Sequence, residues 1–166
     1  MKLNIVLPIK TIDVNGKKIK IPKMGLKHYQ LLKEVRSCDD TIKTLLDTIC
    51  PGLNAAESEM VMLHLFAFNG KIKNTKGDLN VDNVYICTEN TFTLNGKEYT
   101  FNSPMLSSNV EIDDAKFLSM HSDSDYDFHN FPAFIMEWAK GLRKTVALDT
   151  PNGTIYGGIN IMEALA

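Results

Sequence analysis

The sequence has few cysteines, little net charge and no long apolar run, and each shortage excludes a class of protein. Its three cysteines, Cys38, Cys50 and Cys87, form no pairs with short spacing, so neither a disulfide framework nor a zinc ribbon is indicated. Eighteen basic and twenty acidic residues leave a net charge of -2, which argues against a general polyanion binder. We therefore expect a protein of a reducing compartment that needs no cofactor or metal and binds no nucleic acid.

The apolar stretches are too short, and too often interrupted by polar residues, for the ~20-residue length of a membrane-spanning helix. The first eight residues, from Met1 to Pro8, lack the hydrophobic region of a signal peptide. A chain of 166 residues fits one domain, which can bury roughly 68–70% of the surface of the unfolded chain. We expect synthesis in the cytoplasm and a single domain, residues 1–166, without a membrane-spanning segment.

The N-terminal segment has the pattern of a β-hairpin followed by a helix. A short apolar strand ends at Leu7-Pro8, and Asn15-Gly16 accepts the positive φ angles that a type I′ turn requires. Apolar and lysine side chains alternate in the return strand, residues 18–22, which predicts one buried face and one solvated face. Apolar residues then recur at helical spacing from Leu26 onward, so an amphipathic helix should follow the hairpin.

Two further helices are predicted in the first half of the chain. The segment Ile42–Ile49 carries apolar residues at i, i+3, i+4 and i+7, and Asp39 or Asp40 can cap its N-terminus. Asn54, with Glu57 three residues later, has the pattern of a capping box at the start of the next helix. The second half of this helix is almost entirely apolar, so we expect it to be the central helix of the core.

Strand and helix patterns alternate in the second half. Asn95-Gly96 predicts another hairpin, and Pro132 suits the first position of a helix. The expected elements are strands near 84–86, 91–94, 99–101, 145–148 and 154–156, helices at 113–120 and 131–144, and an apolar terminal segment at 159–165. We predict an α+β fold with an N-terminal β-hairpin, a three-helix core, a second small antiparallel β segment and a C-terminal helix. Residues 1–70 would hold the hairpin and helices, and residues 71–166 the strands, an acidic loop and the C-terminal helix.

The acidic loop comes nearest to the pattern of a catalytic or metal site. Its candidate residues are His121, Asp123, Asp125 and His129. Its alternating carboxylates match the start of a calcium loop, but Phe128 and Phe134 stand where that loop needs glycine and a closing glutamate. The chain also lacks a His-Glu-x-x-His motif and a Gly-x-Ser-x-Gly motif. We expect a solvated loop and no catalytic residue; the alternative is a hydrolase or metal-dependent enzyme that uses this cluster.

Five segments of the first half carry a resemblance through their order along the chain. They are Leu7-Pro8, Asn15–Pro22, Leu26–Lys33, Ile42–Leu53 and Asn54–Asn69. The order of a strand, a Gly-Lys turn, a strand, a helix, a helix ending in cysteine and a third helix resembles the small baseplate hub proteins of T-even-like contractile-tailed bacteriophages. Among these the chain is most similar to the baseplate hub distal subunit, partly because of residues 131–138 and the turn at 151–153.

The resemblance implies a structural component or an assembly chaperone of a phage tail baseplate hub, acting through protein–protein contacts and without catalysis. The implied partners are other baseplate hub and tail proteins, and a homo-oligomer stays open. The implied locations are the cytoplasm of the infected bacterial host during assembly and the tail baseplate of the virion. The family implies no catalytic residues and no cofactor.

Two groups of residues are candidates for partner binding. They are the hairpin lysines Lys17, Lys18 and Lys20, and the terminal apolar residues Ile159, Ile161, Met162 and Leu165. Apolar side chains of this kind can form the buried centre of an interface. Two alternatives stay open. In one, the terminal segment completes the protein's own core; in the other, the hairpin lysines, with Lys23 and Lys27, serve a nucleic-acid adaptor.

Overall fold

The computed structural model describes residues 7–26, 28, 38–106 and 112–166. Its elements, in chain order, are β1 Ile9–Val14, β2 Lys17–Pro22, α2 Cys38–Ile49, α3 Ala55–Phe68, β3 Thr75–Lys76, β4 Leu79–Asn80, η1 Val81–Asn83, β5 Tyr85–Ile86, β6 Thr91–Leu94, β7 Lys97–Thr100, α4 Asp114–His121, η2 Phe128–Asn130, α5 Ile135–Arg143, β8 Val146–Thr150, β9 Gly153–Tyr156 and α6 Gly158–Leu165. This mixture of helices and small antiparallel sheets confirms the predicted α+β class.

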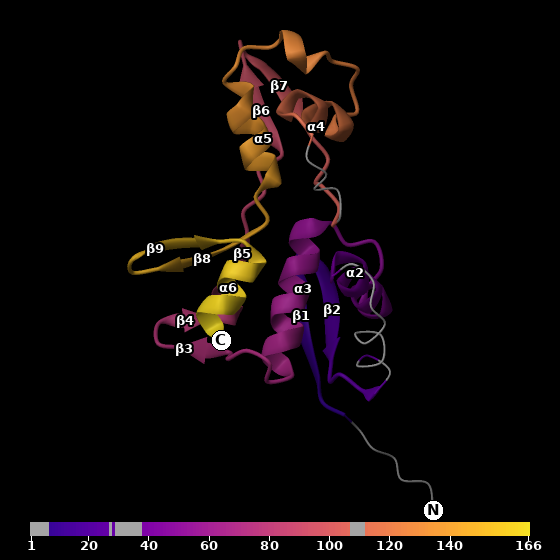
Figure 1. Cartoon of the computed structure of the whole chain (residues 1–166), viewed down its shortest axis with the longest axis vertical. Helices are drawn as coiled ribbons and strands as arrows, with labels where there is room; N and C mark the ends of the chain where they lie inside the picture. Colours follow the sequence, from indigo (N-terminus) through magenta and orange to yellow (C-terminus); the bar gives the residue numbers. More distant parts are fainter. Residues whose placement is uncertain (1–6, 27, 29–37, 107–111) are drawn as a thin grey trace, which may run out of the picture.

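Figure 1 shows the chain in two parts along its long axis. The lower part holds β1 to β5, α2, α3, β8, β9 and α6, and the upper part holds β6, β7, α4 and α5. The chain enters the upper part after β5 and returns at β8, which pairs antiparallel with β5. The single-domain organisation predicted above stays a prediction, and one cooperative unfolding transition is its test.

The N-terminal hairpin forms at the predicted turn. Asn15 and Gly16 have φ angles of 51° and 80°, as a type I′ turn requires, and β1 pairs antiparallel with β2. Ile19 and Ile21 are buried, so the alternating pattern of the return strand is confirmed. The prediction that the first strand ends at Pro8 is wrong, because β1 begins at the following residue, opposite the end of β2.

α3 is the central helix of the lower part, as its apolar composition predicted. Its capping box is confirmed: the Asn54 side chain accepts from the Glu57 N–H at 2.9 Å, and the Glu57 carboxylate accepts from the Asn54 N–H at 3.2 Å. α2 begins at Cys38, so Asp39 and Asp40 lie within the helix, and the predicted cap at one of them is wrong. Most of the helix predicted from Leu26 lies outside the described residues.

The apolar side chains form two clusters. The lower cluster surrounds α3 and includes Ile21, Leu46, Val61, Leu63, Val146, Leu148, Ile161 and Leu165. The upper cluster includes Phe101, Phe117, Leu118, Phe128, Ile135, Trp138, Ala139 and Leu142. The upper cluster is mainly aromatic, and the rings of Phe92 and Trp138 stack with centroids 5.3 Å apart. Residues from 146 onward therefore pack with the first half of the chain, while those between β5 and β8 form a core of their own.

The two helices α4 and α5 of the second half differ in how well their predicted bounds agree with the structure. α4 occupies the position expected at 113–120, with the Asp113 side chain capping it. α5 begins at Ile135, so the prediction of a helix that includes Pro132 is wrong. Residues 132–134 form a turn in which the Pro132 carbonyl accepts from the Ile135 N–H at 3.1 Å. Among the described residues, no helix has both the length and the apolar composition needed to cross a bilayer.

Candidate protein-interaction surface

A shallow apolar depression, the helix groove, lies on the lower part where α2, α3 and α6 meet. Its lining residues are Ile42 and Leu46 from α2, Ser58, Glu59 and Met62 from α3, Ile159 and Met162 from α6, and Leu106. Its volume is ≈ 290 Å³. Ile159 is 66% exposed, which leaves a large apolar side chain in water at the rim. An exposed apolar site of this kind is typical of a surface that binds another protein.

A pair of glycines brings α6 close enough to α3 to form one wall of the helix groove. Gly157 has a φ of 88°, a conformation that residues with a side chain rarely adopt. A Cβ atom at Gly158 would lie 3.2 Å from the Cβ of Glu59. The Glu59 carboxylate instead accepts from the Gly158 N–H at 3.1 Å, so it holds the first turn of α6 against α3.

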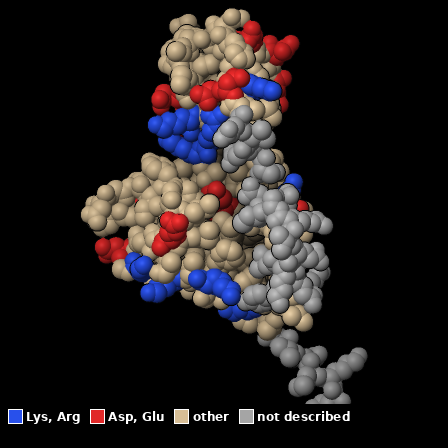
Figure 2. All heavy atoms as spheres, in the orientation of Figure 1, with Lys and Arg blue, Asp and Glu red and all other residues tan. Residues whose placement is uncertain are grey.

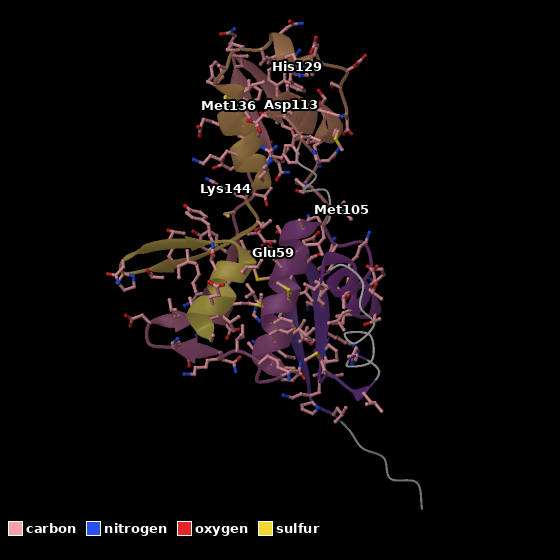
Figure 3. All side chains as sticks on the ribbon, in the orientation of Figure 1. Glu59, Met105, Asp113, His129, Met136 and Lys144 are labelled. Atoms are coloured by element: carbon pink, nitrogen blue, oxygen red, sulfur yellow. The ribbon has the colours of Figure 1, made fainter. Side chains whose placement is uncertain are left out.

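A second depression continues the helix groove past the N-terminal end of α3. It has a volume of ≈ 370 Å³ and shares Leu46, Ser58 and Leu106 with the helix groove. Lys43 and Asp47 add one charge of each sign to its lining. In Figure 3, Glu59 and Met105 both lie near the upper end of α3, below the level of Lys144. The two depressions therefore form one surface close to the junction of the two parts.

The structure separates the predicted terminal apolar residues into two groups. Ile161 and Leu165 are 0% exposed and pack in the lower cluster, so they contribute to the protein's own core. Ile159 and Met162 line the helix groove. Of the four predicted terminal residues, these two are therefore the ones that a partner can reach. Their role in partner binding stays a prediction.

The hairpin β1–β2, which carries the predicted lysines, lies apart from α6, with α3 between the two in Figure 1. Lys17 forms an ion pair of 2.9 Å with Glu57, whose side chain is only 5% exposed. Lys18 and Lys20 are exposed to solvent. Lys18 lies opposite Asp13 in the backbone register of the hairpin. The pairing of Lys17 compensates the burial of the Glu57 carboxylate and attaches the hairpin to α3. The role of these lysines in partner binding also stays a prediction.

Charges of both signs occupy the rest of the surface. Figure 2 shows lysine and arginine side chains gathered at the base of the upper part, with acidic side chains above and below them. This mixed pattern matches the small net charge of -2. On this face the lysine and arginine side chains would attract a polyanion, and the neighbouring acidic side chains would repel it.

The histidines of the acidic loop have different surroundings. His121 is buried, its Nδ1 lies 2.8 Å from the Phe117 carbonyl oxygen, and its ring packs on that of Phe117. His129 is exposed and lies 3.3 Å from Asp113 and 3.4 Å from Asp127 (Figure 3). The other two predicted residues of the cluster, Asp123 and Asp125, are exposed. Within the described part of the chain, no group of three or more His, Cys, Asp or Glu could hold a metal ion.

The contact of His129 with Asp113 joins the acidic loop to the first turn of α4. The Asp113 carboxylate accepts from the Lys116 N–H at 2.9 Å, and this bond is the main cause that lowers the pKa of Asp113. The charge of His129 lowers that pKa further. Sequence analysis had no signal for this pair, because it placed Asp113 at a helix start and not in the acidic loop.

A second cluster that sequence analysis missed joins Lys10, His64 and Asp82. Lys10 donates to Asp82 at 2.8 Å, and its Nζ lies 3.3 Å from the His64 Nδ1. An ammonium group can only donate, so the His64 Nδ1 accepts and the ring is neutral. Burial, together with the Lys10 charge, lowers the pKa of His64 to about 4 against the opposing effect of Asp82. The three residues lie on different elements, and no local pattern predicts that they meet.

Comparisons with known proteins agree with the resemblance seen in the motifs. The family model described as the baseplate hub distal subunit matches residues 21–165. The chain is also 38% identical to the baseplate hub assembly protein gp28 of Enterobacteria phage T4, over 173 aligned positions that cover 98% of each protein. No solved structure matches. The chain belongs to the baseplate hub distal subunit family, and it is a structural protein of a bacteriophage tail baseplate.

Proposed function

We propose that this protein acts in the assembly of the baseplate hub by binding other hub proteins of the same phage. The observation that carries the proposal is the family match across residues 21–165. The printed name of the T4 relative, a baseplate hub assembly protein, supports an assembly role. In this proposal the protein is made in the cytoplasm of the infected bacterium and acts there before the hub joins the tail.

The proposed action is non-catalytic. The buried position of His121, bonded to a helix carbonyl, supports a structural role for that side chain. The ion pair between Lys17 and Glu57 similarly supports a structural role for one of the hairpin lysines. The exposed apolar rim at Ile159 supports action through protein–protein contacts. We accordingly propose a binding protein that neither cleaves a substrate nor binds nucleic acid.

Deletion of the gene from its phage tests the proposal. Infected cells should accumulate incomplete hubs and no finished tails, and expression of the full chain in trans should restore both. The full chain should also bind at least one other baseplate hub protein of that phage when the two are purified together. Complete, infective tails from the deletion phage would contradict an assembly role.

A further inference from the structure

The helix groove is short, and it is lined by side chains one helical turn apart. Ile42 and Leu46 are four residues apart on α2, and Ile159 and Met162 are three apart on α6. One turn of helix rises about 5.4 Å, so side chains at these spacings leave room for one or two large side chains of a helix that lies across the groove. Met62 and Met162 give it flexible walls, because the unbranched methionine side chain adapts to the shape of an inserted group.

One carboxylate, that of Glu59, lies beside this apolar lining. It accepts from the Gly158 N–H, and among the described residues no lysine, arginine or histidine nitrogen lies within ion-pair distance of it. A carboxylate can accept several hydrogen bonds at once, so Glu59 retains capacity for another donor. A partner that covered Glu59 with apolar groups alone would displace the water around the carboxylate and offer no hydrogen bond in its place. The cost of this dehydration would oppose binding. Glu59 also lines a smaller depression together with Arg143 and Lys144, but these two cations form their ion pairs with Asp114 and Glu89. A donor from the partner, best of all a cation, would complement the remaining capacity of the Glu59 carboxylate.

The spacing on α3 matches the spacing of side chains on a helix. Glu59 and Met62 are three residues apart, so they lie on neighbouring positions of one helix face. A facing helix presents its own side chains at i and i+3 or i+4 with the same separation of about 5–6 Å. One such side chain can enter the apolar groove at Met62 while the next reaches Glu59.

We infer that the helix groove binds an amphipathic helix of another hub protein. This helix inserts a large apolar side chain between Met62 and Ile159 and places a lysine or arginine, one turn away, against Glu59. The inference rests on the proposed function, because it assumes a hub protein as partner, and it adds the surface and the chemistry of the bound segment.

The test uses the full chain and each of the other baseplate hub proteins of the same phage, purified and titrated one by one. For a protein that binds, Ile159→Asp should weaken the affinity by about tenfold or more, because it places a charge in the apolar contact. Glu59→Gln should weaken binding measurably while retaining an acceptor for the Gly158 N–H. Both variants should melt at the wild-type temperature, so that a loss of binding reports the surface and not the fold.

Met136→Asp is the matched control. Met136 is 59% exposed, close to the 66% of Ile159, but it lies on α5 in the upper part, as Figure 3 shows. The control should bind as the wild type does. A photo-crosslinking residue at position 159 should attach to a partner helix that carries a lysine or arginine three or four residues from the attached apolar residue.

The outcomes separate the inference from the proposed function. If a hub protein binds and Ile159→Asp leaves the affinity unchanged, or Met136→Asp weakens it equally, the helix groove is the wrong surface while the assembly role stands. A cross-link from position 159 to a second copy of this chain, or to a segment without a nearby cation, also overturns the inference. If no hub protein binds the wild-type chain, the proposed function fails and the inference fails with it.

Discussion

His64 should make the stability of this protein depend on pH between about 4 and about 6.5. The folded state holds the pKa of this histidine at about 4, whereas the ordinary value is 6.5. Between these values the unfolded chain binds a proton at position 64 and the folded chain does not. Since stability rises with pH wherever the unfolded state binds more protons, the free energy of unfolding should fall as the pH is lowered through 6.5. The loss should be complete only below about pH 4, where His64 is protonated in both states.

The size of the effect follows from the shift and from the burial of the ring. His64 has a side chain that is only 7% exposed, so solvent screens its surroundings weakly. A shift from 6.5 to about 4 corresponds to about 3 kcal/mol over the whole range, and to about 2 kcal/mol between about pH 7 and about pH 5. Urea unfolding at these two pH values, followed by circular dichroism, measures the difference directly.

The variant His64→Gln isolates this contribution, because it removes the titrating ring and keeps an acceptor for Lys10. Its loss of stability between about pH 7 and about pH 5 should be smaller than that of the wild type by about 2 kcal/mol. His129→Gln serves as the control, since it removes an exposed histidine from the upper part. Equal pH dependence in His64→Gln and the wild type would refute the reasoning, and a reduction of the same size in the control would show that the effect does not belong to His64.

Three further predictions concern the core, the α6 contact and the acidic loop. Leu46→Ala should lower the free energy of unfolding by about 2–5 kcal/mol, because Leu46 is 3% exposed within the lower cluster; a change below about 0.5 kcal/mol in urea unfolding would contradict this. Gly158→Val should destabilise the fold by about 1–3 kcal/mol through overlap with Glu59, and an unchanged melting temperature would show that α6 can shift away. Isothermal titration with calcium, zinc and manganese should show no stoichiometric binding at micromolar concentrations, with Asp125→Asn melting as the wild type does; a tight one-to-one isotherm that this substitution abolishes would overturn the solvated-loop interpretation.

Local patterns in the sequence were enough for the elements whose residues interact with near neighbours. The Asn15-Gly16 turn and the capping box from Asn54 to Glu57 are confirmed, because a positive φ angle or a side chain bonded three residues away depends only on local chemistry. The order of such motifs also led to the family. Helix starts were less predictable: Asp39 and Pro132 both suit a helix start, yet α2 begins at Cys38 and α5 at Ile135, because several nearby residues can begin a helix equally well.

The candidate surface could be predicted only in part. The apolar terminal segment was recognised from its composition, but composition does not tell Ile161, which is buried in the core, from Ile159, which is exposed. Met62 and Glu59 carried no sequence signal for binding, because their neighbours in the groove come from α2 and α6, about 15 to 100 positions away in the chain.

The sequence by itself determined the hairpins, the central helix α3 and membership of the hub family, since these depend on residue types at short spacing. Only the tertiary structure decided that residues after β8 pack with the first half, that Lys10, His64 and Asp82 meet, and that α2, α3 and α6 enclose a groove. The physical reason is that contacts between distant segments depend on how whole elements bury their apolar faces together. A single sequence records which residues are apolar, and it does not record which of the available partners each of them meets.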